Sequence, residues 1–292
     1  MTFNKDGIYY IEHAHVPVRI ALASHSSNDD TPVIAWTISD DFLDHMWLIK
    51  SVPNEVDTYT IRNTVAGTFM DSGGRTANGA QIVGYHQTNS DNQKWIIKKE
   101  TSGTGFWKIQ NKTTKNFIDL LDGGSADGTK IVGWSGSWDD GTSQGHQHWT
   151  FTPQSLRGSE IHTFLLRNPY LRQDFKSYQA DGMYLILSRA RLQAIWRDSG
   201  LSSRKWRSEI FDCDDFAFVY KAQAAKWGDD TFKADGFAIL CGVMFGTKPV
   251  TNEGHAYNWM IKPEDHTSIV FFEPQNNTFM DNPGYNAYFG VF

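Results

Sequence analysis

Apolar residues in the first half of the chain come in short runs that turn-forming residues separate. Runs such as 82–85 (IVGY), 94–97 (KWII) and 130–134 (KIVGW) are rich in β-branched residues and lie between clusters of Gly, Asn, Asp and Ser. No apolar stripe with a period of about 3.6 residues persists, so the pattern is not that of an amphipathic helix. Short runs of this kind predict β-strands, and hence an all-β region up to about residue 155.

A threefold repeat organises this all-β region. Its copies, named copies one, two and three below, begin at residues 18–36, 68–85 and 116–134 and close at 44–49, 92–97 and 146–151. The closing tryptophans Trp47, Trp95 and Trp149 are 48 and 54 residues apart. A single copy could not bury its apolar face alone, so three copies of about four short strands each predict a closed β-trefoil.

After residue 155 the pattern changes to helical periodicity followed by strands. Helices are expected at 159–169 and 189–200, and a third within 206–228, capped by Asp212 and ending at Gly228. Strands are expected at 236–246, 255–262, 268–275 and 287–292. Helices first and antiparallel strands afterwards are typical of an α+β domain. We therefore predict two domains, residues 1–155 and residues 156–292.

Composition narrows the possible partners and compartments. The net charge of −6 argues against nucleic acid, which needs a basic surface. No apolar stretch is long enough to span a membrane, and the first 20 residues lack the apolar core of a signal peptide. Two cysteines, Cys213 and Cys241, exclude a disulfide framework and a cysteine-rich zinc site.

Two QxW motifs, Gln93-Lys94-Trp95 and Gln147-His148-Trp149, close copies two and three. This pattern resembles R-type (ricin-B-like) lectins. In that family the Gln and Trp are chiefly structural, while sugar is bound by an Asp near the start of each repeat and an aromatic residue about 15 positions later. A carboxylate can accept sugar hydroxyls, and an aromatic face can stack on a pyranose.

The resemblance implies carbohydrate-binding residues in two copies. They are Asp71 with Tyr85 in copy two and Asp119 with Trp134 in copy three. Copy one has Ala21 at the Asp position and His45 at the Gln position, although it retains Trp36, so we expect it not to bind sugar. The alternative is that Asp71 and Asp119 are only turn formers after a strand.

The second domain places a Cys, a His and a Glu in the order that a papain-like cysteine peptidase needs. Cys213 lies at the expected N-terminus of a helix, where free N–H groups favour a thiolate. His255 begins a predicted strand and Glu273 ends the next one. The hypothesis makes Cys213 the nucleophile, His255 the base and Glu273 the residue that orients the imidazole. A core Cys, a surface His and a turn Glu are the alternatives.

Long strings extend the resemblance to the whole chain. They are KWRSEIFDCDDFA, KAQAAKWG, GFAILCGVM, GHAYN, VFFEPQN and LRQDFKSY. With the repeats, they resemble the fungal chimerolectins of the Marasmius oreades agglutinin family. The resemblance implies an R-type lectin fused to a calcium-dependent papain-like peptidase, with Trp206 and Gln275 as further active-site residues. It also implies a homodimer formed largely through the C-terminal domain.

Two features near Cys213 depart from the general papain pattern. The stretch before it contains no Gln to stabilise an oxyanion, so Trp206 or Gln275 would have to supply that donor. Neighbouring acids also raise the thiol pKa, and a bound hard cation would reverse this effect. We predict Asp214 and Asp215 as calcium ligands, with Glu209 as a third. Helix-terminal acids that the dipole favours are the alternative.

Together these features predict a cytotoxic or defence lectin that binds cell-surface glycans and cleaves protein substrates there. Polyporus-type members favour Neu5Acα2,6Gal and Marasmius-type members Galα1,3Gal, and the strings favour the former. The alternatives are a pure dimeric lectin with an inactive C-terminal scaffold, or a Cys-His-Glu amidase or acyltransferase. Lacking a signal peptide, the protein is expected in the cytosol of a producing fungus, acting at target cell surfaces or after uptake.

Overall fold

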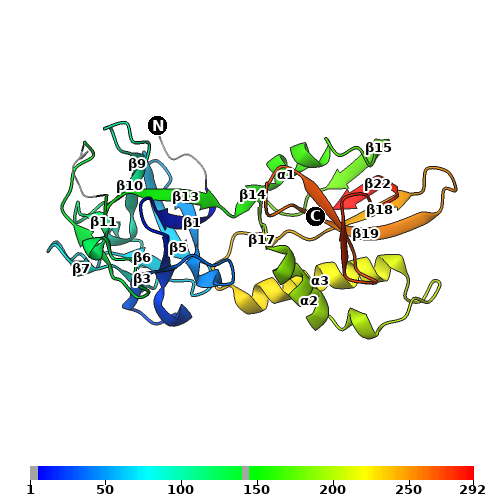
Figure 1. Cartoon of the computed structure of the whole chain (residues 1–292), viewed down its shortest axis with the longest axis horizontal. Helices are drawn as coiled ribbons and strands as arrows, with labels where there is room; N and C mark the ends of the chain where they lie inside the picture. Colours follow the sequence, from blue (N-terminus) through cyan, green and yellow to red (C-terminus); the bar gives the residue numbers. More distant parts are fainter. Residues whose placement is uncertain (1–5, 140–144) are drawn as a thin grey trace. The chain divides into compact units, whose positions relative to one another are not determined.

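The computed structural model describes residues 6–139 and 145–292 and divides the chain into two units (Figure 1). The N-terminal unit comprises Met1–Gln154 together with Phe232–Asp235, and the C-terminal unit comprises Ser155–Thr231 and Gly236–Phe292. The division between them lies beside residue 155. The sequence pattern did not predict that Phe232–Asp235 belongs to the N-terminal unit.

The N-terminal unit is all-β. Its strands are β1 (Gly7–His13), β2 (Val18–Leu22), β3 (Thr31–Thr37), β4 (Met46–Ser51), β5 (Thr58–Asn63), β6 (Phe69–Asp71), β7 (Ala80–Gln81), β8 (Val83–Tyr85), β9 (Trp95–Lys99), β10 (Trp107–Asn111), β11 (Phe117–Leu120), β12 (Ile131–Trp134) and β13 (Trp149–Pro153). Single 3-10 turns interrupt them at η1 (Ala23–His25), η2 (Leu43–His45), η3 (Asp91–Gln93) and η4 (Leu121–Gly123).

Strand pairing closes this unit into a barrel with three hairpins. Antiparallel pairs run in a ring from β1 to β4, β5, β9, β10, β13 and back to β1. Each copy adds one hairpin outside the ring, namely β2–β3, β6–β8 and β11–β12. A closed ring leaves the barrel no free edge strand. This architecture is the β-trefoil that the repeats predict.

The closing tryptophans occupy equivalent places in the barrel core. Trp47, Trp95 and Trp149 are each 0% exposed. Their indole N–H groups donate to the carbonyls of Ile20, Met70 and Ile118 at 2.9, 2.9 and 3.1 Å. Each of these carbonyls belongs to the first strand of a copy's hairpin. The indole therefore joins the barrel to the hairpin in the same way three times, which satisfies a buried polar group at each joint.

The C-terminal unit combines helices with two sheets. Its helices are α1 (Gly158–Leu165), α2 (Arg189–Asp198), the 3-10 turn η5 (Leu201–Ser203) and α3 (Cys213–Thr231). A small sheet contains β14 (Ser155–Arg157), β16 (Met183–Leu185) and β17 (Ala238–Ile239). The larger sheet has the order β15 (Leu171–Tyr178), β22 (Asn286–Val291), β18 (Gly242–Thr247), β19 (Gly254–Ile261), β20 (Ile269–Glu273) and β21 (Thr278–Met280).

The helices and strands predicted for this unit are present with two differences. Helix α3 begins at Cys213, as the expected cap at Asp212 requires, and the backbone of 207–211 before it forms a tight turn with an isolated bridge between Arg207 and Phe211. The strand expected at 236–246 is divided into β17 and β18, which belong to different sheets. Four strands, β14, β15, β16 and β21, were not predicted. Strand β15 is an edge strand with few buried residues and little apolar pattern, and each of the other three has only three residues.

The strands of the larger sheet bury a continuous apolar core. Its residues include Tyr257, Trp259 and Phe271, all 0% exposed. Helix α3 lies against β19 through Ala217, whose carbonyl accepts a hydrogen bond from the Asn258 amide at 3.0 Å. This bond holds the first half of α3 against the middle of β19. Among the described residues, no helix combines the length and the apolar character that a membrane crossing requires.

Candidate functional site

Cys213 is the first residue of α3, and the turn before it is arranged as a helix cap. The Asp215 carboxylate accepts from the backbone N–H of Asp212 at 3.1 Å, and the Asp212 carbonyl accepts from the N–H of Phe216 at 3.1 Å. Cys213 is partly exposed and packs beside Ala217, Val243 and Ala256. In this position the thiol lies at the positive end of the α3 dipole.

His255 and Glu273 form a close pair across two neighbouring strands. Strands β19 and β20 are antiparallel, so the beginning of the first lies beside the end of the second. The Nε2 of His255 lies 2.6 Å from Oε2 of Glu273, and both side chains are largely buried. The Tyr285 ring packs on the imidazole with centroids 4.8 Å apart. This pairing fixes the imidazole plane and leaves Nδ1 as the ring nitrogen that could exchange a proton with a thiol.

The Cys213 thiol contacts the strand that carries the predicted base. The backbone N–H of Ala256, the residue after His255, interacts with the sulfur and lowers the thiol pKa. Burial acts in the opposite direction and dominates, and the charges of Asp212 and Asp214 add to it, so the pKa of Cys213 is raised above its usual value. The structure thus gathers Cys213, His255 and Glu273 around the start of β19.

The structure shows no contact between Cys213 and the side chain of Gln275 or Trp206, the other two predicted active-site residues, among the hydrogen bonds of the described residues. The backbone N–H of Gln275 donates to Oε1 of Glu273 at 3.1 Å, which holds the carboxylate that faces His255. Trp206 is 55% exposed in the turn before α3. Within residues 6–139 and 145–292, no hydrogen bond joins the Trp206 or Gln275 side chain to Cys213. Their role as oxyanion donors stays a prediction.

Three side chains at this helix end could hold a cation together. Ligand atoms of Asp212, Cys213 and Asp214 lie within 4.8 Å of one another. Asp212 and Asp214 share a hydrogen bond that lowers the pKa of Asp212 and raises that of Asp214. Two carboxylates this close prefer to hold one proton between them, and a hard cation could replace that proton. The two carboxylates supply oxygen donors of the kind that calcium takes, whereas the sulfur of Cys213 is not a ligand for a hard cation.

The cluster differs from the predicted ligand set of Asp214, Asp215 and Glu209. Asp215 uses its carboxylate to cap α3, and Glu209 donates its backbone N–H to Oδ2 of Asp212 at 3.3 Å. Asp212, which the sequence suggested as the helix cap, takes the place that we expected for Asp215. The Asp212 carboxylate accepts from the turn before α3, whereas the Asp215 carboxylate accepts from the backbone at the helix cap.

In the trefoil, the predicted carbohydrate-binding pairs lie on matching positions of their hairpins. Phe69 pairs with Tyr85 and Phe117 pairs with Trp134, so Asp71 and Asp119 occupy the same diagonal position relative to their aromatic partners. Residues at such positions project from the same face of a hairpin. The Trp134 ring is 37% exposed and Tyr85 is half-buried, so both rings have accessible surface.

The two aspartates are more buried than a fully open sugar site would require. Oδ1 of Asp71 accepts from the backbone N–H of Gly73 at 2.6 Å, which is the turn-forming role given above as the alternative. Asp119 is 6% exposed and Oδ2 accepts from Gln147 Nε2 at 3.0 Å. Burial raises the pKa of Asp119, although the bond from Gln147 opposes this. Each carboxylate has one oxygen committed to the protein.

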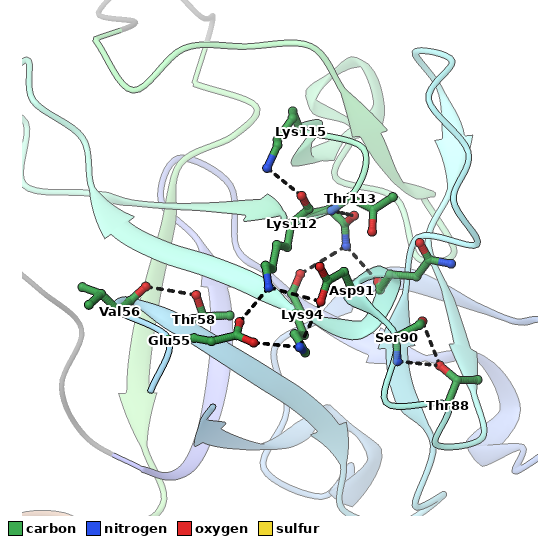
Figure 2. Close-up of polar contacts among 12 residues, drawn as sticks. Glu55, Val56, Thr58, Thr88, Ser90, Asp91, Lys94, Lys112, Thr113 and Lys115 are labelled. Carbon is green, nitrogen blue, oxygen red and sulfur yellow. Dashed lines mark hydrogen bonds and ion pairs between the residues drawn. The ribbon is translucent and has the colours of Figure 1, made fainter. Parts of the chain in front are cut away.

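The QxW glutamines hold the backbone that follows each aromatic residue. Gln93 donates to the His86 carbonyl at 2.7 Å, and Gln147 donates to the Ser135 carbonyl at 3.2 Å. The turn η3, which carries Gln93, is itself held by four charged side chains (Figure 2). In this ion-pair tetrad each lysine contacts both acids, and its members are Glu55, Asp91, Lys94 and Lys112. The tetrad thus holds η3, and with it Gln93, through the carboxylate of Asp91.

Comparisons with known proteins agree with this division of the chain. Residues 43–134 match the model of the ricin-type β-trefoil lectin domain-like family, and residues 184–279 match the agglutinin C-terminal family. A search of curated proteins finds no match.

Two solved structures resemble the chain over its whole length. One is described as Polyporus squamosus lectin bound to the human-type influenza-binding epitope Neu5Acα2-6Galβ1-4GlcNAc, and it has 46% identity and a TM-score of 0.89. The other is described as a PSL1a-E64 complex, with 46% identity and a TM-score of 0.88. Each alignment covers 100% of both chains. The protein therefore belongs to the fungal R-type lectin family that includes Polyporus squamosus lectin.

Proposed function

We propose that the trefoil binds glycans that end in Neu5Acα2-6Gal. The full-length 46% identity to Polyporus squamosus lectin, whose structure is described with that epitope, carries this proposal. Asp71 with Tyr85 and Asp119 with Trp134 would form the two sites. The exposed ring face stacks on the sugar, and the carboxylate oxygen not committed to the protein accepts a hydroxyl.

Calorimetric titration of the full chain with Neu5Acα2-6Galβ1-4GlcNAc tests this proposal. Tyr85→Ala and Trp134→Ala should each remove about half of the binding stoichiometry, because each truncation removes the stacking surface of one site. Tyr178→Ala, which truncates an exposed aromatic of the C-terminal unit, serves as the matched control and should leave binding unchanged. A glycan array on which only galactose-terminated ligands bind would overturn the sialic acid preference.

We further propose that the C-terminal unit is a papain-like cysteine endopeptidase. The 2.6 Å pair between His255 and Glu273, together with a thiol at the N-terminus of α3, supports this second function. Cys213 attacks the peptide carbonyl, His255 takes the thiol proton through Nδ1 and returns it to the leaving amine, and Glu273 orients the imidazole. The Trp206 indole or the Gln275 amide would donate to the oxyanion.

Calcium is the proposed cofactor of this activity, with Asp212 and Asp214 as the residues that would hold it. When bound, the ion supplies positive charge beside a thiol whose pKa the acids otherwise raise. The chain's own residues then share the remaining tasks. Ala256 donates its N–H toward the sulfur, and the Gln275 backbone keeps Glu273 facing His255.

Casein hydrolysis by the wild type and Cys213→Ala, each with calcium and with a chelator, tests the peptidase and its cofactor. Activity is expected only in the wild type with calcium. Labelling by E64, the compound named with the solved relative PSL1a, gives an independent readout on Cys213. No hydrolysis and no labelling in any sample would favour the competing proposal, a lectin whose C-terminal unit is an inactive scaffold.

The two activities would be combined in one cytotoxic or defence protein. Glycan binding would concentrate the peptidase on cell-surface proteins, and a homodimer would add avidity because two linked trefoils can bind one surface. Sedimentation of the full chain at several concentrations measures the oligomeric state directly. A monomer at every concentration would contradict the proposed avidity, and it would not affect the proposed glycan-binding and peptidase sites.

A further inference from the structure

The imidazole of His255 lies in a cluster of aromatic rings as well as beside the Glu273 carboxylate. The centroid of the Tyr285 ring is 4.8 Å from that of the imidazole, with 33° between the two ring planes. The Tyr257 ring is 6.1 Å from the imidazole at 29°, and 6.1 Å from the Tyr285 ring at 34°. Each ring of this cluster therefore neighbours the other two, at distances where offset aromatic pairs attract one another.

The two tyrosines of the cluster are held in different ways. Tyr257 follows His255 by two positions in β19, so both side chains lie on the same face of the sheet. Its ring is 0% exposed and packs edge-on against Phe271, with centroids 5.6 Å apart. Tyr285 is half-buried and belongs to the loop before β22. Tyr257 is thus part of the core, whereas Tyr285 is brought to the imidazole by a separate segment of the chain.

A glycine opposite His255 makes room for this segment. Gly246 in β18 pairs with His255 in β19 and with Ala287 in β22. A Cβ atom at Gly246 would lie 3.1 Å from the Cβ of Tyr285 and 3.1 Å from the carbonyl oxygen of Asn286, which is closer than ordinary van der Waals contact. The glycine therefore lets the backbone of Tyr285 approach the strand directly beside the imidazole.

The turn between β18 and β19 contacts the same tyrosine ring. Nζ of Lys248 lies 5.6 Å from the centroid of the Tyr285 ring, and it donates to Oε2 of Glu253 at 2.6 Å. The hydrogen bond to Glu253 is the main cause that raises the pKa of Lys248, and the interaction with Tyr285 adds to it. The Tyr285 ring therefore contacts the imidazole and also the ammonium group of the turn that leads into β19.

The ring contact matters because one hydrogen bond does not fix an imidazole. The bond between Nε2 and Glu273 holds His255 at a single atom, and the ring could still turn about that bond. The face of Tyr285 restricts this rotation and so keeps Nδ1 in place for the thiol. The two bonded side chains are only 16% and 14% exposed, and a hydrogen bond that is shielded from water is electrostatically stronger.

We propose that Tyr285 is a positioning residue of the candidate triad, whose ring holds the His255 imidazole in the plane that serves the Cys213 thiol. The inference rests on the proposed peptidase function and adds a residue to it. Tyr285 acts through His255, and Gly246 with Lys248 determines where its ring lies. Because the ring limits the motion of a reacting group, its loss should affect turnover more than substrate binding.

Steady-state hydrolysis of a fluorogenic peptide by the full chain with calcium tests the effect on turnover. Tyr285→Ala should lower kcat about 10- to 100-fold with little change in KM, the cost expected when a reacting group is misplaced by about 1 Å. Tyr285→Phe keeps the ring and should retain most of the wild-type kcat. Tyr178→Ala, which truncates an exposed tyrosine of β15, is the matched control and should retain it fully.

Two kinetic outcomes would overturn the inference. A loss confined to KM would make Tyr285 a substrate-binding residue. Equal losses in Tyr285→Ala and Tyr285→Phe would show that the hydroxyl, and not the ring face, is responsible.

NMR of the full chain with isotope-labelled histidine gives a readout that does not depend on hydrolysis. In the wild type, His255 should carry its proton on Nε2 with the downfield shift of a bond to a carboxylate, and His255→Gln identifies the signal. Tyr285→Ala should weaken this signal and populate the Nδ1-protonated tautomer, and Gly246→Ala, which displaces the ring, should do the same. Tyr285→Phe should preserve the signal.

The NMR result separates this inference from the function on which it rests. An unchanged His255 signal in Tyr285→Ala would overturn the positioning role even if the wild type hydrolyses peptides. A wild type that hydrolyses no peptide, but whose His255 signal responds to these substitutions as expected, would overturn the proposed peptidase and support the hold of Tyr285 on the imidazole.

Discussion

The N-terminal unit builds the same local geometry three times, whereas the C-terminal unit builds its candidate site once. In the trefoil, three buried indoles make equivalent bonds although the polar residues around them differ from copy to copy. In the C-terminal unit, Cys213, His255 and Glu273 come from α3, β19 and β20, and no second set of this kind repeats them in the described chain. Because the local geometry is repeated, one copy can change its polar groups and the trefoil still folds. In the C-terminal unit a change in any of the three candidate residues would remove the site.

This contrast also explains where variation is found in the sequence. Copy one has Ala21 where the other copies have Asp and His45 where they have Gln. Its β2–β3 hairpin is nevertheless paired, and the Trp47 indole still donates to the Ile20 carbonyl. The tryptophan joints determine the backbone, so the side chains at the sugar positions are free to diversify. In the C-terminal unit the same residues would both shape the site and perform its chemistry.

The largest effect is expected at the single site. Under the proposed peptidase activity, Cys213→Ala should lower casein turnover at least about 1,000-fold, because no other group can form the thioester. Cys241→Ala is the matched control, since Cys241 is 1% exposed and burial raises its pKa to about 12. Equal losses in both variants would show that stability, and not the nucleophile, is responsible.

The next largest effect concerns the three indole joints. Trp→Phe at position 47, 95 or 149 removes the N–H and leaves a buried carbonyl without its donor, which should cost about 1–3 kcal/mol in the free energy of unfolding. Equivalent geometry predicts similar costs in the three variants. Urea unfolding of the full chain measures them, with the partly exposed Trp134→Phe as the control. A large cost at only one position would break the threefold equivalence.

Two buried histidines should make the trefoil less stable in mild acid. Burial is the main cause that lowers the pKa of His13 and of His45 from 6.5 to about 4. The unfolded chain therefore binds protons near pH 6.5 while the folded chain does not, so stability present above pH 6.5 falls as the pH drops toward 4. Each histidine should contribute a loss of up to a few kcal/mol.

Unfolding curves of the full chain between pH 7.5 and 5 measure this dependence. Carboxylates with ordinary pKa values stay ionised in that window, which leaves histidines as the main titrating groups. His45→Gln restores the residue type of the other two copies and should flatten the profile. A profile with the same slope in the wild type and in this variant would contradict the assigned cause.

The smallest effect is expected at the ion-pair tetrad in copy two (Figure 2). Glu55 bridges Lys94 at 2.8 Å and Lys112 at 2.9 Å, but solvent screens such pairs. Glu55→Gln should lower the melting temperature by no more than about 2–4 °C, and the difference should disappear in high salt. A larger, salt-independent decrease would show that the tetrad is essential for the copy-two loop.

The sequence predicted the repetitive parts of the molecule well. Short β-branched runs and regularly spaced tryptophans identified the trefoil, because alternation and repetition are local properties that burial imposes on every copy. The helices and most strands of the second unit were predicted for the same reason. Strands β14, β15, β16 and β21 were not, because a strand with few buried residues, or of only three residues, carries little pattern.

The sequence by itself therefore determined the trefoil, the α+β character of the second unit and the candidate triad, each of which depends on patterns within short segments. Only the tertiary structure decided which acids gather beside Cys213 and which copy has an open pocket. Asp212 lies with Asp214 beside Cys213 while Asp215 caps α3, and a pocket in copy one combines Ala21 from β2 with Asp44 and His45 from η2. Such arrangements depend on how distant segments meet, and spacing along the chain does not encode that directly.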